Sequence, residues 1–457
     1  MKVTTTTGRR PQSVRLPIIS ISFFLALAIP CVPVQAEDLL AIYRLAIEND
    51  ARFRAVEANY MAIQQRVPQA RAGLLPNLSA TGTLNRNDEE VSTDATVFSR
   101  PAGQARYRSS EYRLSLTQPI FNDANWASLR LAEADVRRAQ AEYQTAQQDL
   151  ILRTAQAYFD VLLAQDTLAL ALAEKEALAR NLEATEGRKS AGLVSVTDVN
   201  DARSRFQVAV AQEIEARYKL DDNREALREI SGQPPGMLSG LDAIVAFSMP
   251  DPPDITQWIA SATDKNFALR AAREAVEVAR QTIERSRAAH LPTLDAVGSV
   301  SRVDAGGSIP GPGARSNNTI VVLQLNVPLY QGGLINARTE EAIHRYEAAQ
   351  QDLEGRRRAV ERETRAAFQG ATSSAARIDA LKHAIQAAES ALTAKIEGRK
   401  LGLYTTLDLL DSTRDLYRAK RDYAESRHAY LLNFLKLKNS AATLGEDDVM
   451  AINRWLR

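Results

Sequence analysis

Two similar stretches of the chain contain the polar residues that are best spaced for chemistry. EGRKSAGLVSVTD ends at Asp198, and EGRKLGLYTTLD ends at Asp408 in the second half of the chain. In each, a glycine (Gly192, Gly402) stands where a helix would end in a left-handed residue. The S/T-x-x-D pattern that follows is a helix start signal, so both aspartates have a capping role available without any further function. Asp411 lies three residues after Asp408, and this spacing places both carboxylates on one face of the next helix.

The residue types most often used in catalysis, cysteine and histidine, provide no further candidate site. The only cysteine, Cys31, lies in the N-terminal segment described next. The four histidines are predicted to be surface or interface residues rather than catalysts: His290, His344, His383 and His428. Most acidic residues of the helical stretches are expected to be solvated partners of Arg and Lys. We therefore predict no enzyme activity, no catalytic residue, no metal site and no cofactor.

The N-terminus predicts export. The apolar stretch LPIISISFFLALAI is preceded by four basic residues, Lys2, Arg9, Arg10 and Arg15. A small-residue cleavage pattern ends at Ala36, so we predict a signal peptide over 1–36. Acylation of Cys31 is the alternative, although the preceding Pro30 is a poor neighbour for that processing. Removal of the signal leaves 53 basic and 56 acidic residues, which gives no indication of a nucleic-acid partner. No later stretch approaches the ~18 consecutive apolar residues of a membrane helix.

The rest of the chain is predicted to be a tandem duplication. ARAGLLPNLSATGTLNR corresponds to SRAAHLPTLDAVGSVSR, and LSLTQPIF corresponds to LQLNVPLY. The order of elements is therefore the same in both halves, as in an internal repeat. We expect a first repeat at 37–230, a linker at 231–253, a second repeat at 254–438 and a C-terminal segment at 439–457.

Each repeat is predicted to contain a helical stretch, two strands and a long helical hairpin. The helical stretches, 38–73 and 254–289, end before a Leu-Pro pair, because proline disfavours helix in the preceding residue. Strands with strict alternation follow, separated by loops at about 87–110 and 304–318. Proline-free stretches at 123–188 and 334–400 then predict helices about 100 Å long. Two adjacent seven-residue apolar series occur on the first of these helices, from Leu129, and on the returning C-terminal helix, from Leu409. They indicate two neighbours for each helix, as in a ring of helices, and a bundle core is the alternative that would give a similar stripe.

The alternating strands leave two interpretations. They could form a half-buried soluble sheet, or part of a membrane barrel with lipid outside and water inside. A membrane barrel needs about eight strands or more, so four strands per chain would require several copies.

With these features the chain resembles the TolC-type outer-membrane channels, which form the outer membrane efflux protein family. The resemblance covers nearly the whole chain after the signal and is carried by QPIFNDANWASLRLAEADV, QQDLILRTAQAYFDVLLAQDTLALALAEKEAL and AGLVSVTDVNDAR. It is strongest to the branch that serves type I secretion and multidrug efflux. It implies an α+β membrane protein, a homotrimer with a 12-stranded outer-membrane β-barrel continuous with a long periplasmic α-helical barrel.

The resemblance also implies a function. Such a protein is a passive exit duct in the outer membrane of a Gram-negative bacterium, in contact with outer-membrane lipid. It opens when a periplasmic adaptor and an inner-membrane transporter of the ABC or RND type engage the hairpin tips.

Asp408 and Asp411 occupy the positions of the aspartates that form the tightest ring of the family's tunnel. Three copies would present six carboxylates around one axis, which is expected to attract cations and to raise some of the carboxylate pKa values. The ring would lie on the inner hairpin.

Thr197 and Asp198 match residues of the outer hairpin that hold the family's gate shut through polar links. Their partners in the family are a tyrosine and, five residues later, an arginine, whereas this chain has Arg399 and Tyr404, the same types exchanged. We expect Arg399 to pair with Asp198 and the exchange to preserve closure. A gate of different resting tightness is the alternative.

Two other classes of protein compete with the channel. A periplasmic adaptor of an export machine would have one hairpin flanked by compact β modules, so the duplicated hairpins and four strands argue against it. A filamentous coiled-coil protein would leave the strands unexplained. The linker over 231–254 is expected to join a belt around the tunnel with 444–457, or to be a plain solvated linker.

Overall fold

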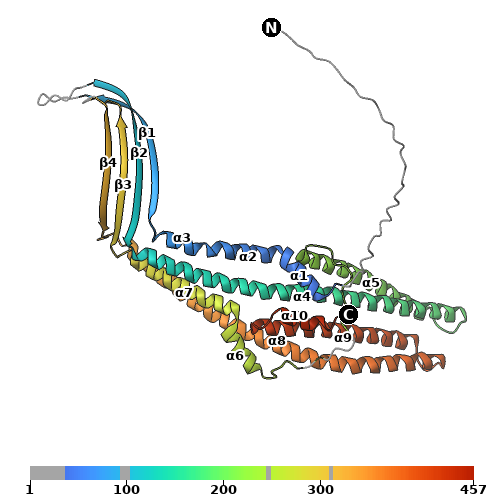
Figure 1. The fold of residues 1–457 in the computed structure, drawn as a ribbon. Helices are drawn as coiled ribbons and strands as arrows, with labels where there is room; N and C mark the ends of the chain where they lie inside the picture. The colour runs from blue at the N-terminus through green and yellow to red at the C-terminus, as the bar shows by residue number, and fades with distance from the viewer. Residues whose placement is uncertain (1–36, 93–102, 243–246, 248, 308–311, 457) are drawn as a thin grey trace, which may run out of the picture. The chain divides into compact units, whose positions relative to one another are not determined.

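The computed structural model describes residues 37–456 except 93–102, 243–246, 248 and 308–311. The predicted signal peptide and Cys31 lie outside the described residues. In chain order the elements are α1 Leu39–Asn49, α2 Ala51–Gln64, α3 Arg66–Ala72, β1 Asn77–Val91, β2 Gly103–Phe121, α4 Asp123–Ser190, α5 Val196–Ser231, α6 Ile255–Lys265, α7 Phe267–Ala288, β3 Thr293–Ala305, β4 Ala314–Asn326, α8 Leu334–Lys400, α9 Thr406–Ser440 and α10 Glu446–Asn453 (Figure 1). Helices, two strands and a long hairpin therefore occur twice. No helix in the described ranges is long and apolar enough to cross a membrane.

The first helical stretch of each repeat is interrupted, which corrects the single stretches predicted over 38–73 and 254–289. Asp50 lies between α1 and α2, and its side chain accepts a hydrogen bond from Phe53 N at 2.6 Å. Asn266 lies between α6 and α7 and accepts from Leu269 N at 3.0 Å. Both are N-caps, which start a new helix by satisfying a free backbone N–H. A further break at Gln65 separates α3 from α2.

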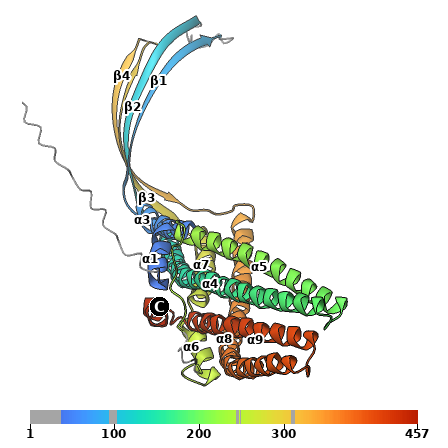
Figure 2. The same ribbon diagram turned by 90° about the vertical axis from the view of Figure 1, so that its right-hand side faces the viewer.

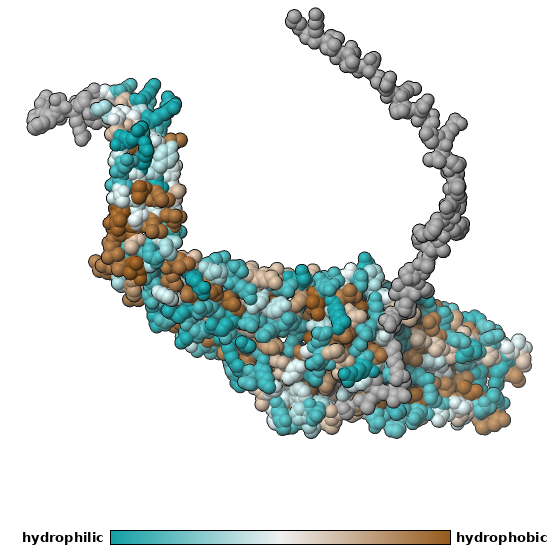
Figure 3. Space-filling model, viewed as in Figure 1, coloured by the Kyte–Doolittle hydropathy of each residue, from teal (hydrophilic) through white to brown (hydrophobic). Residues whose placement is uncertain are grey.

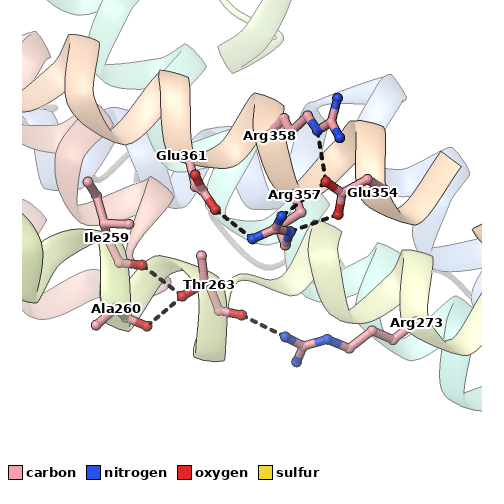
Figure 4. A network of polar contacts seen from close by, with 8 residues as sticks. All are labelled: Ile259, Ala260, Thr263, Arg273, Glu354, Arg357, Arg358 and Glu361. Atoms are coloured by element: carbon pink, nitrogen blue, oxygen red, sulfur yellow. Dashed lines mark hydrogen bonds and ion pairs between the residues drawn. The ribbon is translucent and has the colours of Figure 1, made fainter. Parts of the chain in front are cut away.

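The junction of α6 and α7 is also fixed by an arginine. Arg273 of α7 donates to Thr263 O at 2.7 Å and so satisfies a carbonyl at the end of α6 (Figure 4). On α8, Glu354 accepts from Arg357 and Arg358, and these hydrogen bonds lower its pKa to about 2. These ion pairs are partly exposed in the single chain and contribute little to stability.

The four strands form one antiparallel sheet in the order β1-β2-β3-β4. The strands are longer than the alternating pattern predicts, and the loops are correspondingly shorter than 87–110 and 304–318. β1 pairs with β2 as far as Val91 opposite Gly103, and β3 pairs with β4 as far as Ala305 opposite Ala314. The alternating pattern does not reveal these strand ends, because the residues on both faces of the sheet are polar there while the backbone hydrogen bonding between the strands continues.

The two faces of the sheet differ in polarity near the helices. Leu78 of β1 stands opposite Leu116 of β2, and the next residues on this face are also apolar. On the other face Ser79 and Ser115 stand opposite each other with their hydroxyls 2.9 Å apart. β1 and β4 are edge strands, and neither has a second strand partner in the described part of the chain.

The long helices α4 and α8 contain 68 and 67 residues, and each is followed by a shorter helix that runs back along it. At about 1.5 Å per residue each long helix extends about 100 Å from the sheet strand that precedes it in the chain. The α4–α5 hairpin lies beside the α8–α9 hairpin (Figure 2). The largest apolar core lies where both hairpins meet α1 and α10, around the fully buried Tyr158 and Phe159 of α4.

The linker between the repeats packs on this core. Leu238 is buried in it, and Leu241 forms a β-bridge with Leu456 of the C-terminal segment. Tyr158 donates its hydroxyl to Ser239 O at 2.8 Å, and burial raises the pKa of this tyrosine. The linker and the C-terminus are therefore tied to each other and to α4, in contrast to a linker that only crosses solvent.

Candidate functional site: the paired hairpin tips

Both repeated turns are built around a left-handed glycine. Gly192 has φ +74° and Gly402 has φ +78°. After each, a backbone N–H returns to the helix end, from Leu193 to Arg188 O and from Leu403 to Gly398 O, both at 2.9 Å. This is the hydrogen bonding that closes a helix C-terminus around a left-handed residue. The turn sequence is therefore repeated because each hairpin needs the same backbone reversal.

The aspartates of the two S/T-x-x-D patterns form capping boxes. Ser195 N donates to Asp198 Oδ2 at 2.9 Å, and Asp198 N donates to Ser195 Oγ at 3.1 Å. Thr405 and Asp408 repeat both bonds at the same distances. Hydrogen bonds from the backbone N–H and the hydroxyl of Ser195 lower the pKa of Asp198, and those from the hydroxyl and the backbone N–H of Thr405 lower the pKa of Asp408. The raised carboxylate pKa values expected for a ring depend on neighbouring chains, so that expectation stays a prediction.

Asp411 has a different environment from Asp408. Arg205 of α5 approaches Asp411 Oδ1 to 2.9 Å, and Arg414 approaches the same oxygen to 3.3 Å. Asp411 thus joins the α8–α9 hairpin to the α4–α5 hairpin, whereas Asp408 caps the start of its own helix, α9. Both side chains are half-buried in the single chain.

Arg399 does not pair directly with Asp198 in the described chain, which differs from the pairing expected. Its guanidinium donates to Asn181 Oδ1 at 2.8 Å and to Thr185 Oγ1 at 3.3 Å, both on α4. Burial is the main cause of a lowered pKa of Arg399, Arg188 adds to it, and Asp198 opposes it. Asp198 is therefore close enough to act on Arg399 through space, but the contacts that fix Arg399 are neutral oxygens.

The remaining predicted gate residues do not link the hairpins. The ring of Tyr404 lies over Gly398 of its own hairpin, so close that a Cβ on Gly398 would be 2.7 Å from the ring. Thr197 is exposed, and its side chain has no hydrogen bond among the residues that the structure describes. The structure thus brings Arg399, Asp198 and α4 together and leaves Thr197 and Tyr404 apart from that contact.

Contacts that the sequence did not indicate join the hairpins further from the tips. Glu174 of α4 is buried and lies 2.6 Å from Arg421 of α9. Next to this pair is an apolar cluster of Leu178, Ala202, Ala209 and Leu410. One signal was available: Glu174 lies four residues after Leu170 and four before Leu178, on the apolar face of α4.

The histidines differ in environment. His428 of α9 is only 3% exposed and packs against α4, with Nε2 3.3 Å from Asp166, so of the two predicted placements, surface or interface, it has the interface between helices. His290 contacts Asn336, and the exposed His344 contacts Glu347. Within the described ranges no cluster of three potential ligands could hold a metal ion.

Two tandem repeats, an amphipathic sheet with open edges and two long hairpins that meet near their tips define the subunit of a tunnel-forming channel. The family model "Outer membrane efflux protein" matches residues 42–233 and 258–443. The outer membrane protein TolC of Vibrio cholerae is 36% identical over 428 residues, 93% of this chain and 95% of that protein. TolC of Escherichia coli K12 is 34% identical over 435 residues, 92% of this chain and 85% of that protein. The chain belongs to the outer membrane efflux protein family.

Two further comparisons agree with this family. The proteases secretion protein PrtF of Dickeya chrysanthemi is 31% identical over 427 residues, 93% of this chain and 92% of that protein. The solved structure of the Campylobacter jejuni CmeC outer membrane channel has a TM-score of 0.77 at 14% identity, with 92% of this chain and 90% of that chain covered, a likeness of fold. The predicted family, fold class and outer-membrane location are confirmed. The chain is an exit duct for efflux or secretion, and the adaptor alternative is not favoured.

Proposed function

We propose that three copies of this chain form the duct, with four strands each in one 12-stranded barrel. The open edges of β1 and β4 support this assembly, because an edge strand exposes unpaired backbone N–H and C=O groups that can pair with a strand of another chain. A membrane barrel also needs about eight strands or more. The apolar face of the sheet then meets lipid, and the serine- and threonine-rich face meets water. The helical hairpins of three chains form a ring below the barrel.

The hairpin tips are proposed as the gate. In a trimer, Asp408 and Asp411 of each inner hairpin surround the axis and make the narrowest, cation-attracting section. Asp411 is already held by Arg205 of the outer hairpin, and Arg399 is held by Asn181 and Thr185. These contacts keep the inner hairpin against the outer one, so the resting duct is closed.

Conduction through the open duct is proposed to be passive, with no catalysis by this chain. The family members described above are named as outer-membrane and secretion proteins, which supports transport rather than enzyme activity. An inner-membrane transporter and a periplasmic adaptor supply the energy and the opening contact. Exposed apolar side chains at both turns, Leu193 and Leu403, offer the surface that an adaptor would cover. Drugs, small toxins and unfolded secreted proteins are all candidate cargoes of such a duct.

The single observation that carries the gate proposal is the contact of Asp411, one helical turn after Asp408, with Arg205 of the other hairpin. We would record single-channel current across planar bilayers with purified protein and with Asp408→Asn plus Asp411→Asn. The parent is expected to show small, cation-selective steps, and the double variant is expected to lose that selectivity. Asp415→Asn, on the same helix but exposed, is the matched control and should keep the parent's selectivity.

The absence of current from either protein, under conditions where oligomers insert, would contradict the duct. Membrane fractionation gives an independent reading, because a barrel stays in the outer membrane as a heat-modifiable oligomer.

A further inference from the structure

The outer end of the sheet carries an arginine patch that no role described above explains. Above the apolar rows, Arg86 of β1, Arg108 of β2 and Arg302 of β3 are exposed on one face. The same face carries Leu78 and Leu116 nearer the helices, so the patch continues the apolar band that meets lipid. Figure 3 shows this division along the sheet, brown next to the helices and mostly teal toward the far strand ends.

Register places these arginines on the lipid-facing side. Side chains alternate along a strand, so residues an even number of positions from Leu78 share its face, and Arg86 is eight positions on. Arg86 stands opposite Arg108, and Arg302 stands opposite Tyr112, which is four positions before Leu116 on β2. All three guanidinium groups therefore leave the sheet toward the membrane side rather than toward the water-filled interior.

The direct pairing of Arg86 with Arg108 is unfavourable by itself. Like charges opposite each other in a sheet repel, since their Cβ atoms are about 5 Å apart. Neither residue, nor Arg302, has an ion pair or side-chain hydrogen bond within the part of the chain that the structure describes. A surface hollow of about 560 Å³ lies beside the pair and is lined by Arg86, Arg108, Ser110 and Asp304.

Other arginines of the sheet have carboxylate partners, which makes the patch stand out. Arg106 contacts Asp88 at 2.9 Å, Arg315 contacts Asp304 at 2.7 Å, and Arg113 contacts Glu111 at 2.6 Å. Asp304 in the wall of the hollow is thus already neutralised. The arginine patch therefore has donors left over for an anion from outside the chain.

We propose that the arginine patch, Arg86, Arg108 and Arg302, binds the phosphate groups of an outer-leaflet lipid. The strands reach the patch after the apolar band, at the end away from the periplasmic helices, and this is where the headgroups of the outer leaflet lie. Guanidinium groups bind phosphate through paired N–H donors, so one phosphate between Arg86 and Arg108 converts their repulsion into two attractive contacts. Arg302 lies about 13 Å nearer the helices along the sheet, two residues beyond Val300 on the same face, and adds a third positive charge at the membrane edge of the patch. This proposal rests on the proposed barrel.

The test uses the full-length oligomer in detergent and bisphosphorylated lipid A as the probe, with bound copies counted by native mass spectrometry. The triple variant Arg86→Gln, Arg108→Gln, Arg302→Gln is expected to bind the lipid at least ~10-fold more weakly. The matched control is Arg106→Gln, Arg113→Gln, Arg315→Gln, which removes the same charge from arginines that already have partners, and its affinity should stay within about twofold of the parent.

Equal weakening in the control variant would overturn the proposal, because the effect would then follow net charge alone. Undiminished binding of lipid A from which the phosphates have been removed, or full displacement of lipid A by millimolar inorganic phosphate, would also overturn it. Should the triple variant fail to assemble, Arg86→Gln alone removes the like-charge pair and should still weaken binding. Single-channel current is recorded for each variant, so a protein that conducts but has lost lipid binding separates this site from the duct itself.

Discussion

The buried ion pair between Glu174 and Arg421 is predicted to hold the inner hairpin against the outer one. Arg421 Nη1 lies 2.6 Å from Glu174 Oε2, with the glutamate side chain 6% exposed and the arginine side chain 29% exposed. The pair joins α4 to α9 close to the apolar cluster around Leu410. Replacing Arg421 with Met would therefore leave a carboxylate buried between two helices without its cation.

The size of the effect follows from that burial. Removing one partner of a fully buried pair costs about 3–5 kcal/mol. Because Arg421 is partly exposed, water screens the pair, and we expect about 2–3 kcal/mol here. If the docked and undocked hairpins are the two states that differ, the docked state loses about 30- to 150-fold in population. Arg421→Met should accordingly raise the time that single channels spend in larger open states.

The double variant Glu174→Leu, Arg421→Met tests the cause. A buried ion pair replaced by apolar residues of similar volume is often neutral, so the double variant should recover most of the closed state. Arg180→Met is the matched control, because Arg180 pairs with Glu176 on the same helix with both side chains about two-thirds exposed, and it should change little. An unchanged open time in Arg421→Met, or a double variant as leaky as the single one, would refute the reasoning.

Three further predictions concern the tips. Arg399→Ser removes two hydrogen bonds to α4, so leak current should rise, and an unaltered leak would count against its role in closure. Gly398→Ala should lower the thermal stability of the trimer, because the added Cβ would clash with the ring of Tyr404. Gly187→Ala, at the equivalent position with open space around it, should raise the stability by up to about 1 kcal/mol. Equal effects of the two substitutions would contradict this prediction. Because the pKa values of Asp198 and Asp408 are lowered, their caps stabilise the tips above about pH 4, and this contribution is lost as the pH falls through the lowered pKa values. The difference in melting temperature between the parent and the Asp→Asn variants should therefore shrink in acid.

Much of the fold could be predicted because the same order of helices, strands and hairpin is encoded in both halves of the sequence. The Leu-Pro pairs, the alternating strands and the glycines at the turns each recur at the corresponding place, so each copy supports the interpretation of the other. The strand ends were missed because alternation disappears where Arg86 or Asn317 replaces an apolar residue. The breaks at Asp50 and Asn266 were missed because an N-cap inside a helical stretch looks like any polar surface residue.

The candidate site was less predictable because its contacts are distant in sequence. The glycines and capping boxes depend on neighbours within three or four residues, and such local chemistry is readable from the sequence. Arg399 and Thr185 are 214 positions apart, and Arg421 and Glu174 are 247 positions apart. Only the packing of one hairpin on the other brings them together, and no local pattern specifies that packing.

The duplication that makes the fold predictable from the sequence also weakens the contact between the two hairpin tips. Arg188 and Arg399 occupy equivalent positions in the two EGRK stretches, and the packed hairpins bring them close enough for Arg188 to lower the pKa of Arg399. Like charges therefore meet at the tips, opposed by Asn181 and Thr185, whereas further along the helices an ion pair and an apolar cluster hold the hairpins together. Interactions at the tips are the weaker set, because the two arginines repel each other and the neutral hydrogen bonds that oppose this repulsion contribute about 1 kcal/mol each. Opening is thus expected to begin at the tips and to reach the buried pair last.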